Sequence, residues 1–334
     1  MMRVVVIGDG RWFKNEAAIA RAVRSLGHAC RLINVRGWTW SLGRAAAPAL
    51  AAMANAFRPD VVILGRHAYD LGEERLRRLV RNRFSTLWYQ DLRIPPIPEV
   101  LALGRIVNTM FTTYAPQVET YQAAGIRRVR FLPQGVDPDL DRPADRFPEA
   151  YRCDVSFVGN ASITFRHELF RRLAKLERVQ FRGSGWNKAP AGLPVAGGQV
   201  YGKAYAQVVA GAAICLGIHS EAQETQYASA SNRMWKVLGC GGFFLGPFVE
   251  GINQMAQDGV HCAYYRDPDE CLAQVGRYLA SPGERRAIAA AGRAHAMEHH
   301  TYAQRIRLML EDRGYPLDRT FGVPVESQPP MTRT

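Results

Sequence analysis

The chain has 334 residues, of which 47% are hydrophobic, so it is long enough for two ordinary domains with a sizeable core. No apolar run approaches the roughly 18–20 residues that span a bilayer. The first apolar run is only four residues long, which favours a first strand over a signal peptide. The six cysteines form no Cys-x-x-Cys pair, so we expect reduced core thiols in a cytoplasmic protein.

The charge balance is strongly basic. Forty-three basic residues against 30 acidic ones give a formal net charge of +13. This charge favours an anionic partner, such as a membrane surface, a phosphorylated substrate or a nucleic acid. A composition that is simply rich in arginine is the alternative explanation.

The first third of the chain alternates strands and helices. Short, apolar, β-branched runs predict strands at 3–8, 29–35, 60–65, 86–91 and 106–113. The segment 15–27 has helical spacing, with Asn15 as its expected N-cap and Gly27 as its expected C-cap. Continuous apolar strands alternating with amphipathic helices predict a parallel sheet that is covered on both faces.

The pattern breaks at 133–152, where four prolines and four aspartates replace the apolar periodicity. We interpret this stretch as a linker between a domain at 1–132 and a domain at 153–312, with a tail at 313–334. Strands are expected at 153–159, 179–183, 213–219 and 242–246. Helices are expected at 165–176, 230–239, 252–259 and 269–280, and one long helical end at 283–313. The sequence therefore predicts two successive doubly wound α/β domains, whose ligands bind beyond the carboxyl ends of the strands.

Three polar residues follow strands of the first predicted sheet. Asp9, His67 and Asp91 each come at or just past a strand's carboxyl end, so they could converge in one cleft and act as a general base. For each of them alone, a structural role is the favoured explanation; as the base, Asp91 is preferred and His67 comes third. The turn after the first strand is Gly-x-Gly, but Phe13 stands where a dinucleotide fingerprint needs Gly or Ala, which argues against NAD binding.

The second predicted domain offers a phosphate site. The segment 229–236, "SASNRMWK", predicts a helix capped by Ser229 or Ser231, and helix N-termini bind phosphate through their free amides. Arg233 and Lys236 lie three apart on one face of that helix, placed to hold a diphosphate. Two solvated cations on a helix face are the alternative reading.

Metal chemistry has little support in the sequence. No Asp-x-Asp cluster or P-loop is present. His295 and His299 have a spacing that can bind zinc, yet the glutamate is misplaced for a zinc protease motif, so a solvated helix face is the expected reading. We expect no metal and no cofactor.

The stretch 231–246, "SNRMWKVLGCGGFFLG", with the segment that follows it, resembles the C-terminal domain of group-1-like glycosyltransferases, in particular the spore-maturation-protein branch. The shared features are an Arg, an aromatic and a Gly-Cys-Gly-Gly turn, then "DPDE", "SPGERRAIAAAGR" and a terminal group of His300, Thr301, Tyr302 and Arg305. The segments "LPQGVDPDL" and "CDVSFVG" match the interdomain stretch of the same enzymes. The resemblance covers about residues 130–310.

This resemblance implies a GT-B fold, in which two Rossmann-like domains face each other across a cleft. The C-terminal domain would hold a nucleotide-sugar donor without a metal, and the N-terminal domain the acceptor. The implied donor-binding residues are Arg233, Lys236, Ser231, Asn232, Gly159, Asn160, Gly183, Tyr201 and Glu224. Many relatives carry two glutamates eight apart where this chain has Ala228 and Lys236, so Glu221 or Glu224 would have to replace them.

The function that the sequence predicts is transfer of a sugar from a nucleotide-diphospho-sugar to an acceptor, which could be a glycan, a lipid-linked molecule or a protein. The donor, the acceptor and the choice between retention and inversion stay open. A non-catalytic assembly protein on the same scaffold, a sugar-nucleotide epimerase and a nucleic-acid binder are the alternatives; we expect no nucleic-acid partner. The positive charge also predicts peripheral association with an anionic membrane face.

Overall fold

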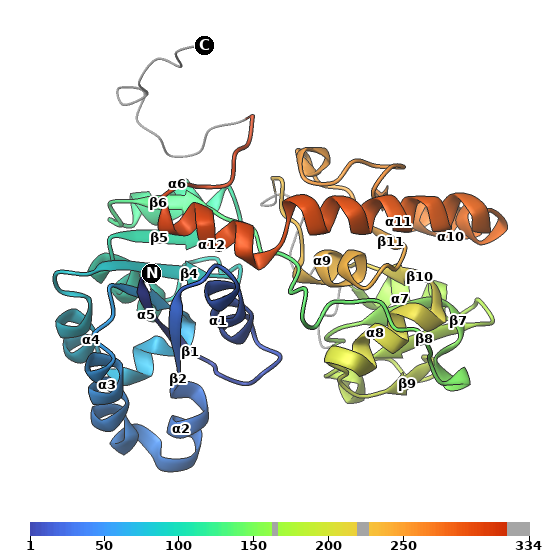
Figure 1. Ribbon diagram of the computed structural model, residues 1–334. Helices are drawn as coiled ribbons and strands as arrows, with labels where there is room; N and C mark the ends of the chain where they lie inside the picture. Colours follow the sequence, from blue (N-terminus) through green and yellow to red (C-terminus); the bar gives the residue numbers. More distant parts are fainter. Residues whose placement is uncertain (162–165, 219–226, 319–334) are drawn as a thin grey trace, which may run out of the picture. The chain divides into compact units, whose positions relative to one another are not determined.

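The computed structural model describes residues 1–161, 166–218 and 227–318. The chain divides into two compact units, which are described separately here (Figure 1). Unit 1 comprises Met1–Pro133 and Ile306–Thr334, and unit 2 comprises Gln134–Arg305. Across the described ranges, every helix is too short or too polar to cross a bilayer.

Unit 1 is built on a six-stranded parallel sheet with the order β2-β1-β3-β4-β5-β6. Strand β1, which lies between β2 and β3, is fully buried from Val4 to Ile7, which explains the unbroken apolar run in the sequence. Five strands occupy predicted positions, whereas the three-residue β6 was not predicted. The strands are β1 (Arg3–Gly8), β2 (Ala29–Asn34), β3 (Val61–Leu64), β4 (Phe84–Tyr89), β5 (Thr109–Thr112) and β6 (Val129–Phe131).

The helices of unit 1 include one from the far end of the chain. They are α1 (Asn15–Ser25), α2 (Val35–Leu42), α3 (Ala47–Ala56), α4 (Glu73–Val80), α5 (Pro98–Ile106), α6 (Gln117–Ala123) and most of α12 (Tyr302–Leu310). The hydroxyl of Thr109 donates to Asp312 over 2.7 Å, and Thr86 contacts the sulfur of Met309 at 3.4 Å. The chain's end therefore packs on the first sheet.

The predicted caps of α1 are corrected by the structure. Lys14 is the N-cap residue and Asn15 is the first helical residue, whose side-chain amide donates to Gln90. Leu26 is the C-cap, and Gly27 follows it with a φ of +80°. Gly27 thus still ends the helix, since a left-handed residue cannot continue it.

Unit 2 holds a second six-stranded parallel sheet with the order β12-β11-β10-β7-β8-β9. Phe170 anchors its core, with ring centroids 5.1 Å from Phe157 and 5.0 Å from Phe181. The strands are β7 (Cys153–Val158), β8 (Val179–Arg182), β9 (Val195–Gly197), β10 (Ala212–Leu216), β11 (Phe244–Pro247) and β12 (Ala263–Tyr265). The helices are α7 (His167–Leu173), α8 (Gly202–Gly211), α9 (Asn232–Gly239), α10 (Pro268–Ala280) and α11 (Pro282–His299).

Two predicted helices of this half differ from the structure. The single helix expected at 283–313 is broken at His300 and Thr301, because the carbonyl of His300 accepts a hydrogen bond from Val136 (2.7 Å) instead of continuing the helix. The helix expected at 252–259 is only a 3-10 turn, Ile252–Gln254, ending before a left-handed Gly259. The bond from Val136 also ties the predicted linker to unit 2.

Both sheets have a point at which the strand order reverses. In unit 1 this switch point lies between β1 and β3, and in unit 2 it lies between β7 and β10. In doubly wound sheets the helices that follow two such strands leave to opposite faces, and ligands bind there beyond the carboxyl ends of the strands. The predicted class, two doubly wound α/β units, is confirmed, and each switch point is where a ligand is expected.

Candidate functional site

Arg233 reaches both strands that flank the switch point of unit 2. It is the second residue of α9, and its Nε donates to the carbonyl of Val158 at the end of β7 over 2.8 Å. Its Nη1 donates to the carbonyl of Ile218, just past β10, over 3.3 Å. The guanidinium carbon also lies 4.5 Å from the centroid of Phe157. Burial lowers the pKa of Arg233, although an arginine stays charged at any physiological pH.

Arg166 is a second buried cation at the same place, only 3% exposed. Its Nη1 donates to the carbonyl of Asn160 over 2.6 Å, and its Nη2 donates to the carbonyl of Ile218 over 3.2 Å. Two guanidinium groups therefore share the Ile218 carbonyl and give this edge of the sheet a positive potential. The sequence reasoning missed Arg166, although a basic residue at a helix start after a Gly-Asn turn is a usable signal.

The glycines at this edge let the backbone pack closely. Gly183 has a φ of +131°, and a Cβ there would lie 2.1 Å from the carbonyl oxygen of Gly159. A Cβ on Gly159 would lie 2.4 Å from Nη2 of Arg233. Only glycine fits at either position, so the turn after β7, the turn after β8 and the Arg233 side chain form one packed group.

The start of α9 completes the edge. Ser231 is the N-cap residue, with extended backbone angles of φ −67° and ψ 147°, and its side chain makes no capping hydrogen bond. Ala228, three residues earlier, is fully buried with a left-handed φ of +49°, a strained conformation that is held by a hydrogen bond to Glu250. A small cavity opens between this N-terminus and the ends of β10 and β11, lined in part by Ile218, Ser229 and Ser231.

Lys236 contacts a different part of unit 2. Its Nζ lies 3.2 Å from Oδ1 of Asp141, a carboxylate that is only 3% exposed. Burial raises the pKa of Asp141, and the Lys236 charge counteracts that rise. Arg233 and Lys236 share a helix, but their charged groups bind different partners, and in this structure Lys236 is committed to Asp141.

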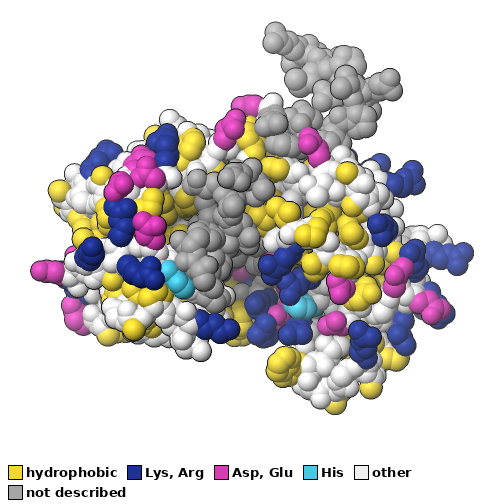
Figure 2. All heavy atoms as spheres, turned by 180° about the vertical axis from the view of Figure 1, so that it is seen from behind, with side chains coloured by type: hydrophobic (Ala, Val, Ile, Leu, Met, Phe, Trp, Pro, Cys, Tyr) yellow, Lys and Arg dark blue, Asp and Glu magenta, His cyan; other side chains and the backbone are white. Residues whose placement is uncertain are grey.

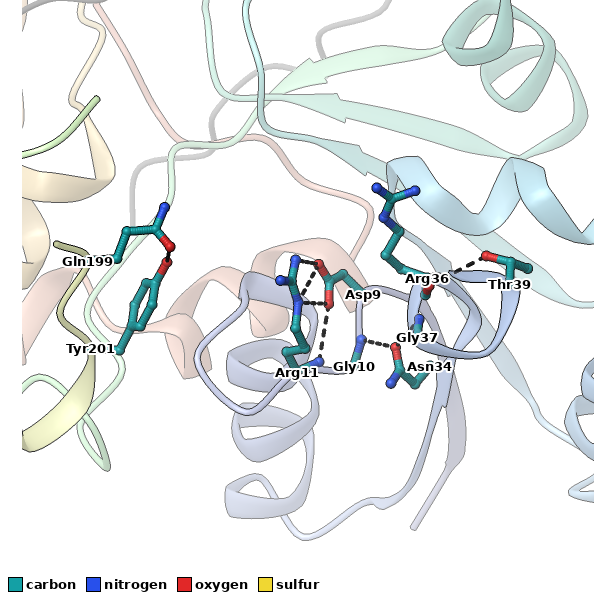
Figure 3. Close-up of polar contacts among 9 residues, drawn as sticks. All are labelled: Asp9, Gly10, Arg11, Asn34, Arg36, Gly37, Thr39, Gln199 and Tyr201. Atoms are coloured by element: carbon teal, nitrogen blue, oxygen red, sulfur yellow. Dashed lines mark hydrogen bonds and ion pairs between the residues drawn. The ribbon is translucent and has the colours of Figure 1, made fainter. Parts of the chain in front are cut away.

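The other predicted donor-binding and metal-binding residues of unit 2 add little to the description of this site. Tyr201 is the N-cap residue of α8, and its hydroxyl donates to Gln199 over 2.7 Å (Figure 3). Glu221 and Glu224 lie outside the described residues. His295 Nε2 lies 2.8 Å from the carbonyl of Met255, and within 1–161, 166–218 and 227–318 no three His, Cys, Asp or Glu side chains are grouped to hold a metal.

In unit 1, Asp9 is buried at the end of β1 and bound by Arg11. Nε of Arg11 donates to Oδ1 over 2.9 Å and Nη2 donates to Oδ2 over 2.5 Å (Figure 3). Burial alone would raise the pKa of Asp9, but the Arg11 hydrogen bonds and charge outweigh it and lower the pKa overall. A carboxylate held in this way is a weak base.

His67 and Asp91 follow the neighbouring strands β3 and β4. Burial, followed by the charges of Arg66 and Arg36, lowers the pKa of His67, so its imidazole is neutral at pH 7 and able to accept a proton. The Asp91 side chain is half exposed and pairs with Arg66 at 2.6 Å. The structure thus places all three predicted bases at the carboxyl edge of one sheet, with different surroundings.

Glu16 is a fourth titratable group at this edge, and sequence reasoning missed it. It lies in the first turn of α1, and its Oε1 occupies the space beside two glycines: Cβ atoms built on Gly8 and Gly65 would lie 2.5 and 2.3 Å from it. Burial raises the pKa of Glu16. The glycines at the ends of β1 and β3 could have indicated this position in the sequence, because two residues without side chains leave room for another side chain over the switch point.

Comparisons with known proteins also point to glycosyltransferases. Residues 165–311 match a family model described as glycosyl transferase-like. No curated protein matches the chain. The match leaves the particular spore-maturation branch a prediction.

Solved structures share the fold over nearly the whole chain. A glycosyltransferase from Rickettsia africae ESF-5 is 11% identical and has a TM-score of 0.63, covering 93% of this chain and 97% of its own. Anabaena HepE in complex with UDP-glucose is 12% identical with a TM-score of 0.65, covering 93% and 99%. An alpha-glucosyltransferase in complex with UDP and a 13-mer DNA is 8% identical with a TM-score of 0.70, covering 93% and 98%. The predicted GT-B class, with two Rossmann-like units, is therefore confirmed.

Proposed function

We propose that the protein is a glycosyltransferase that moves a sugar from a nucleoside-diphosphate sugar, held by unit 2, to an acceptor held by unit 1. The observation that carries the proposal is the convergence of Arg166 and Arg233 on the carbonyl of Ile218, at the switch point of unit 2. Both arginines lie inside the segment that matches the glycosyl transferase-like model. Two structures of the same fold hold UDP or UDP-glucose.

The two arginines supply the electrostatics that such a transfer needs. Negative charge grows on the diphosphate as the bond to the sugar breaks, and fixed cations stabilise that charge in the transition state. Nη2 of Arg233 lies beside Gly159 in the turn after β7, and a guanidinium can donate to the oxygens of a diphosphate. The amides at the start of α9 add to this field. Charge neutralisation by the chain itself makes a bound metal unnecessary in this proposal.

Lys236 has a supporting role in this scheme. It neutralises the buried Asp141 and so fixes α9 against the 137–141 loop. The loop in turn belongs to the stretch that Val136 ties to His300. Lys236 therefore positions the helix that carries Arg233 and is expected to matter for stability more than for donor affinity.

If the transfer inverts the anomeric configuration, a base in unit 1 must accept the proton of the acceptor hydroxyl. His67 is the best of the candidates, because its lowered pKa keeps it neutral at pH 7. Asp9 is bound by Arg11, and Asp91 is half exposed and paired with Arg66. The sugar that the protein transfers is proposed to be a hexose, in line with the activity that the sequence predicts.

Nucleotide binding by matched variants tests the proposal. A thermal-shift panel of nucleoside diphosphates identifies the nucleotide, because a tight ligand raises the melting temperature by mass action. A charge-assisted hydrogen bond contributes about 1.5–3 kcal/mol, so Arg233→Ala should weaken diphosphate binding roughly 10–150-fold in calorimetry. Arg233→Lys should rescue only part of this loss, since it lacks the bidentate fork.

Two controls separate a binding defect from a folding defect. The nucleoside without phosphates should bind equally weakly to the wild type and to both Arg233 variants. Lys236→Met, on the same helix, should leave diphosphate affinity within about threefold, since Lys236 is occupied by Asp141. If no nucleoside diphosphate binds the wild type, or if Arg233→Ala binds it as tightly, the proposed donor site is wrong.

A further inference from the structure

Helix α2 presents an unusually apolar surface to solvent. Nine large hydrophobic side chains are exposed in the described part of the chain, and three of them lie in these eight residues: Trp38 (52% exposed), Trp40 (79%) and Leu42 (57%). Val35 is the helix's buried residue. Monomeric proteins rarely leave such a patch without a use.

The surroundings of this helix are basic. From residue 17 to residue 59 the chain has six arginines and no acidic residue. Two of the arginines flank the aromatic residues: Arg36 lies over the Trp40 ring, with 5.3 Å from its guanidinium carbon to the centroid, and the exposed Arg44 follows Leu42. On the face that Figure 2 shows, Lys and Arg are interspersed with Asp and Glu. Trp38 and Leu42 lie one turn apart on one side of the helix, and Arg36 and Trp40 lie one turn apart on another side. We name these four residues and Arg44 the α2 face, which comprises both sides.

We propose that the α2 face docks the protein on a bilayer whose surface carries anionic phosphate groups. Trp is the residue that prefers the membrane–water interface, with an apolar ring and a single polar N–H. Arginine can reach the phosphates from the same depth. A glycan that stacks on Trp is favoured by nearby carboxylates that accept its hydroxyl groups, and the carboxylate of Asp70, which contacts α2, already accepts a hydrogen bond from Thr39 over 3.4 Å. Leu42 has no role in sugar stacking, whereas it gains from insertion into a bilayer.

Helix α2 lies at the edge of unit 1 that holds the predicted bases. α2 begins directly after the carboxyl end of β2, next to β1 in the sheet, and Asn34 at that junction accepts hydrogen bonds from Gly10 and Gly37 (Figure 3). The α2 face thus belongs to the same edge of unit 1 as Asp9. Docking there would bring this edge to the membrane surface. This last step rests on the proposed function and favours a lipid-linked acceptor; the docking itself does not depend on it.

Sedimentation of the full-length protein with lipid vesicles tests the surface. At 0.1 M salt the wild type should bind vesicles that contain phosphatidylglycerol at least tenfold more tightly than vesicles of phosphatidylcholine alone, and high salt should weaken the binding. A basic residue near an anionic surface contributes about 1 kcal/mol, so the double variant Arg36→Gln, Arg44→Gln should bind about 30-fold more weakly. Trp38→Ala with Trp40→Ala should cost at least about tenfold, since burying about 60 Å² of apolar surface suffices for that.

Matched controls lie outside the α2 face. Arg171 and Arg286 are exposed arginines of unit 2, so Arg171→Gln with Arg286→Gln removes the same charge from another place. Val195→Ala with Val260→Ala removes two exposed hydrophobic side chains of unit 2. Both controls should stay within about threefold of the wild type, and melting temperatures check that each variant is folded.

The outcomes separate this proposal from its alternatives. Absent binding of the wild type at low salt, or an equal loss in the control arginine pair, would overturn it. So would a wild-type dimer that Trp38→Ala with Trp40→Ala dissociates, because the face would then belong to a second copy of the chain. The assay contains no nucleotide sugar, so its failure leaves the proposed donor site standing, and a failed nucleotide titration leaves the α2 face standing.

Discussion

His300 should make the stability of the protein depend on pH. It is 1% exposed and stacks on Trp235, with ring centroids 4.2 Å apart. Nη2 of Arg305 lies 2.6 Å from Nδ1 of His300. An arginine can only donate, so Nδ1 must be the acceptor and the imidazole is neutral, with its proton on Nε2. Burial, followed by the Arg305 charge, lowers the pKa of His300 to about 2.

The size of the effect follows from linkage. In the unfolded chain a histidine has a pKa near 6.5, so below that pH the unfolded state binds a proton that the folded state does not. Stability is therefore lost as the pH falls below about 6.5, and the loss continues until the pH approaches the folded value. Between pH 7 and pH 5 the expected loss from His300 is about 2 kcal/mol. This figure holds for any folded pKa below about 4, so it depends little on the depth of the shift.

Denaturant unfolding of the wild type and of His300→Gln at pH 5, 6, 7 and 8 measures this contribution. Glutamine can still accept a hydrogen bond from Arg305 but takes up no proton in this range. The difference in unfolding free energy between the two proteins should change by about 2 kcal/mol from pH 7 to pH 5 and stay constant from pH 7 to pH 8. Parallel curves over the whole range would show that His300 is not the neutral, buried group described here.

Two further predictions concern the two switch points. Gly183→Ala should lower the unfolding free energy of unit 2 by about 2 kcal/mol or more and weaken nucleotide binding. The exposed Gly198 has open space around it, so Gly198→Ala should change that free energy by no more than about 0.5 kcal/mol. Equal effects of the two substitutions in denaturant unfolding would contradict the packed group at Gly159. If the transfer inverts, His67→Gln should lower kcat by roughly 10²–10⁴-fold, and the acidic limb of the wild-type pH–rate profile should lie below 6.5, because the pKa of His67 is lowered. A profile without such a limb, or a loss of less than tenfold, would remove His67 from the mechanism.

Most of the sheet architecture could be predicted from the sequence, because buried parallel strands have a strong signature. Runs such as Val4–Ile7 and Val61–Leu64 are wholly buried, and few other structures need four consecutive apolar residues that are mostly β-branched. The short strands β6, β9 and β12 carry too few residues for a pattern to show. Each has three residues and takes its register from a neighbouring strand rather than from its own sequence.

Helix ends were less predictable, because contacts distant in the sequence decide them. The helical pattern at 283–313 continues through His300, and the break comes from Val136, which claims the carbonyl of His300. Local propensity contains no information about that partner. The cap of α1 shows the same limit, since the Asn15 side chain bonds to Gln90 instead of capping its own helix.

The site shows why spacing on a helix does not settle what a charge binds. Arg233 and Lys236 are three residues apart, yet the partner of Lys236 is Asp141, 95 positions earlier in the chain. Burial raises the pKa of Asp141 and the Lys236 charge counteracts that rise, so the lysine at 236 and the aspartate at 141 stabilise each other's charges. A glutamate at 236, as in many of the enzymes that the sequence resembles, would bring a second carboxylate against Asp141 and force one of the two to take a proton. The lysine is therefore explained by the packing of unit 2, and its departure from the glutamate pattern is no argument against the proposed donor site at Arg166 and Arg233.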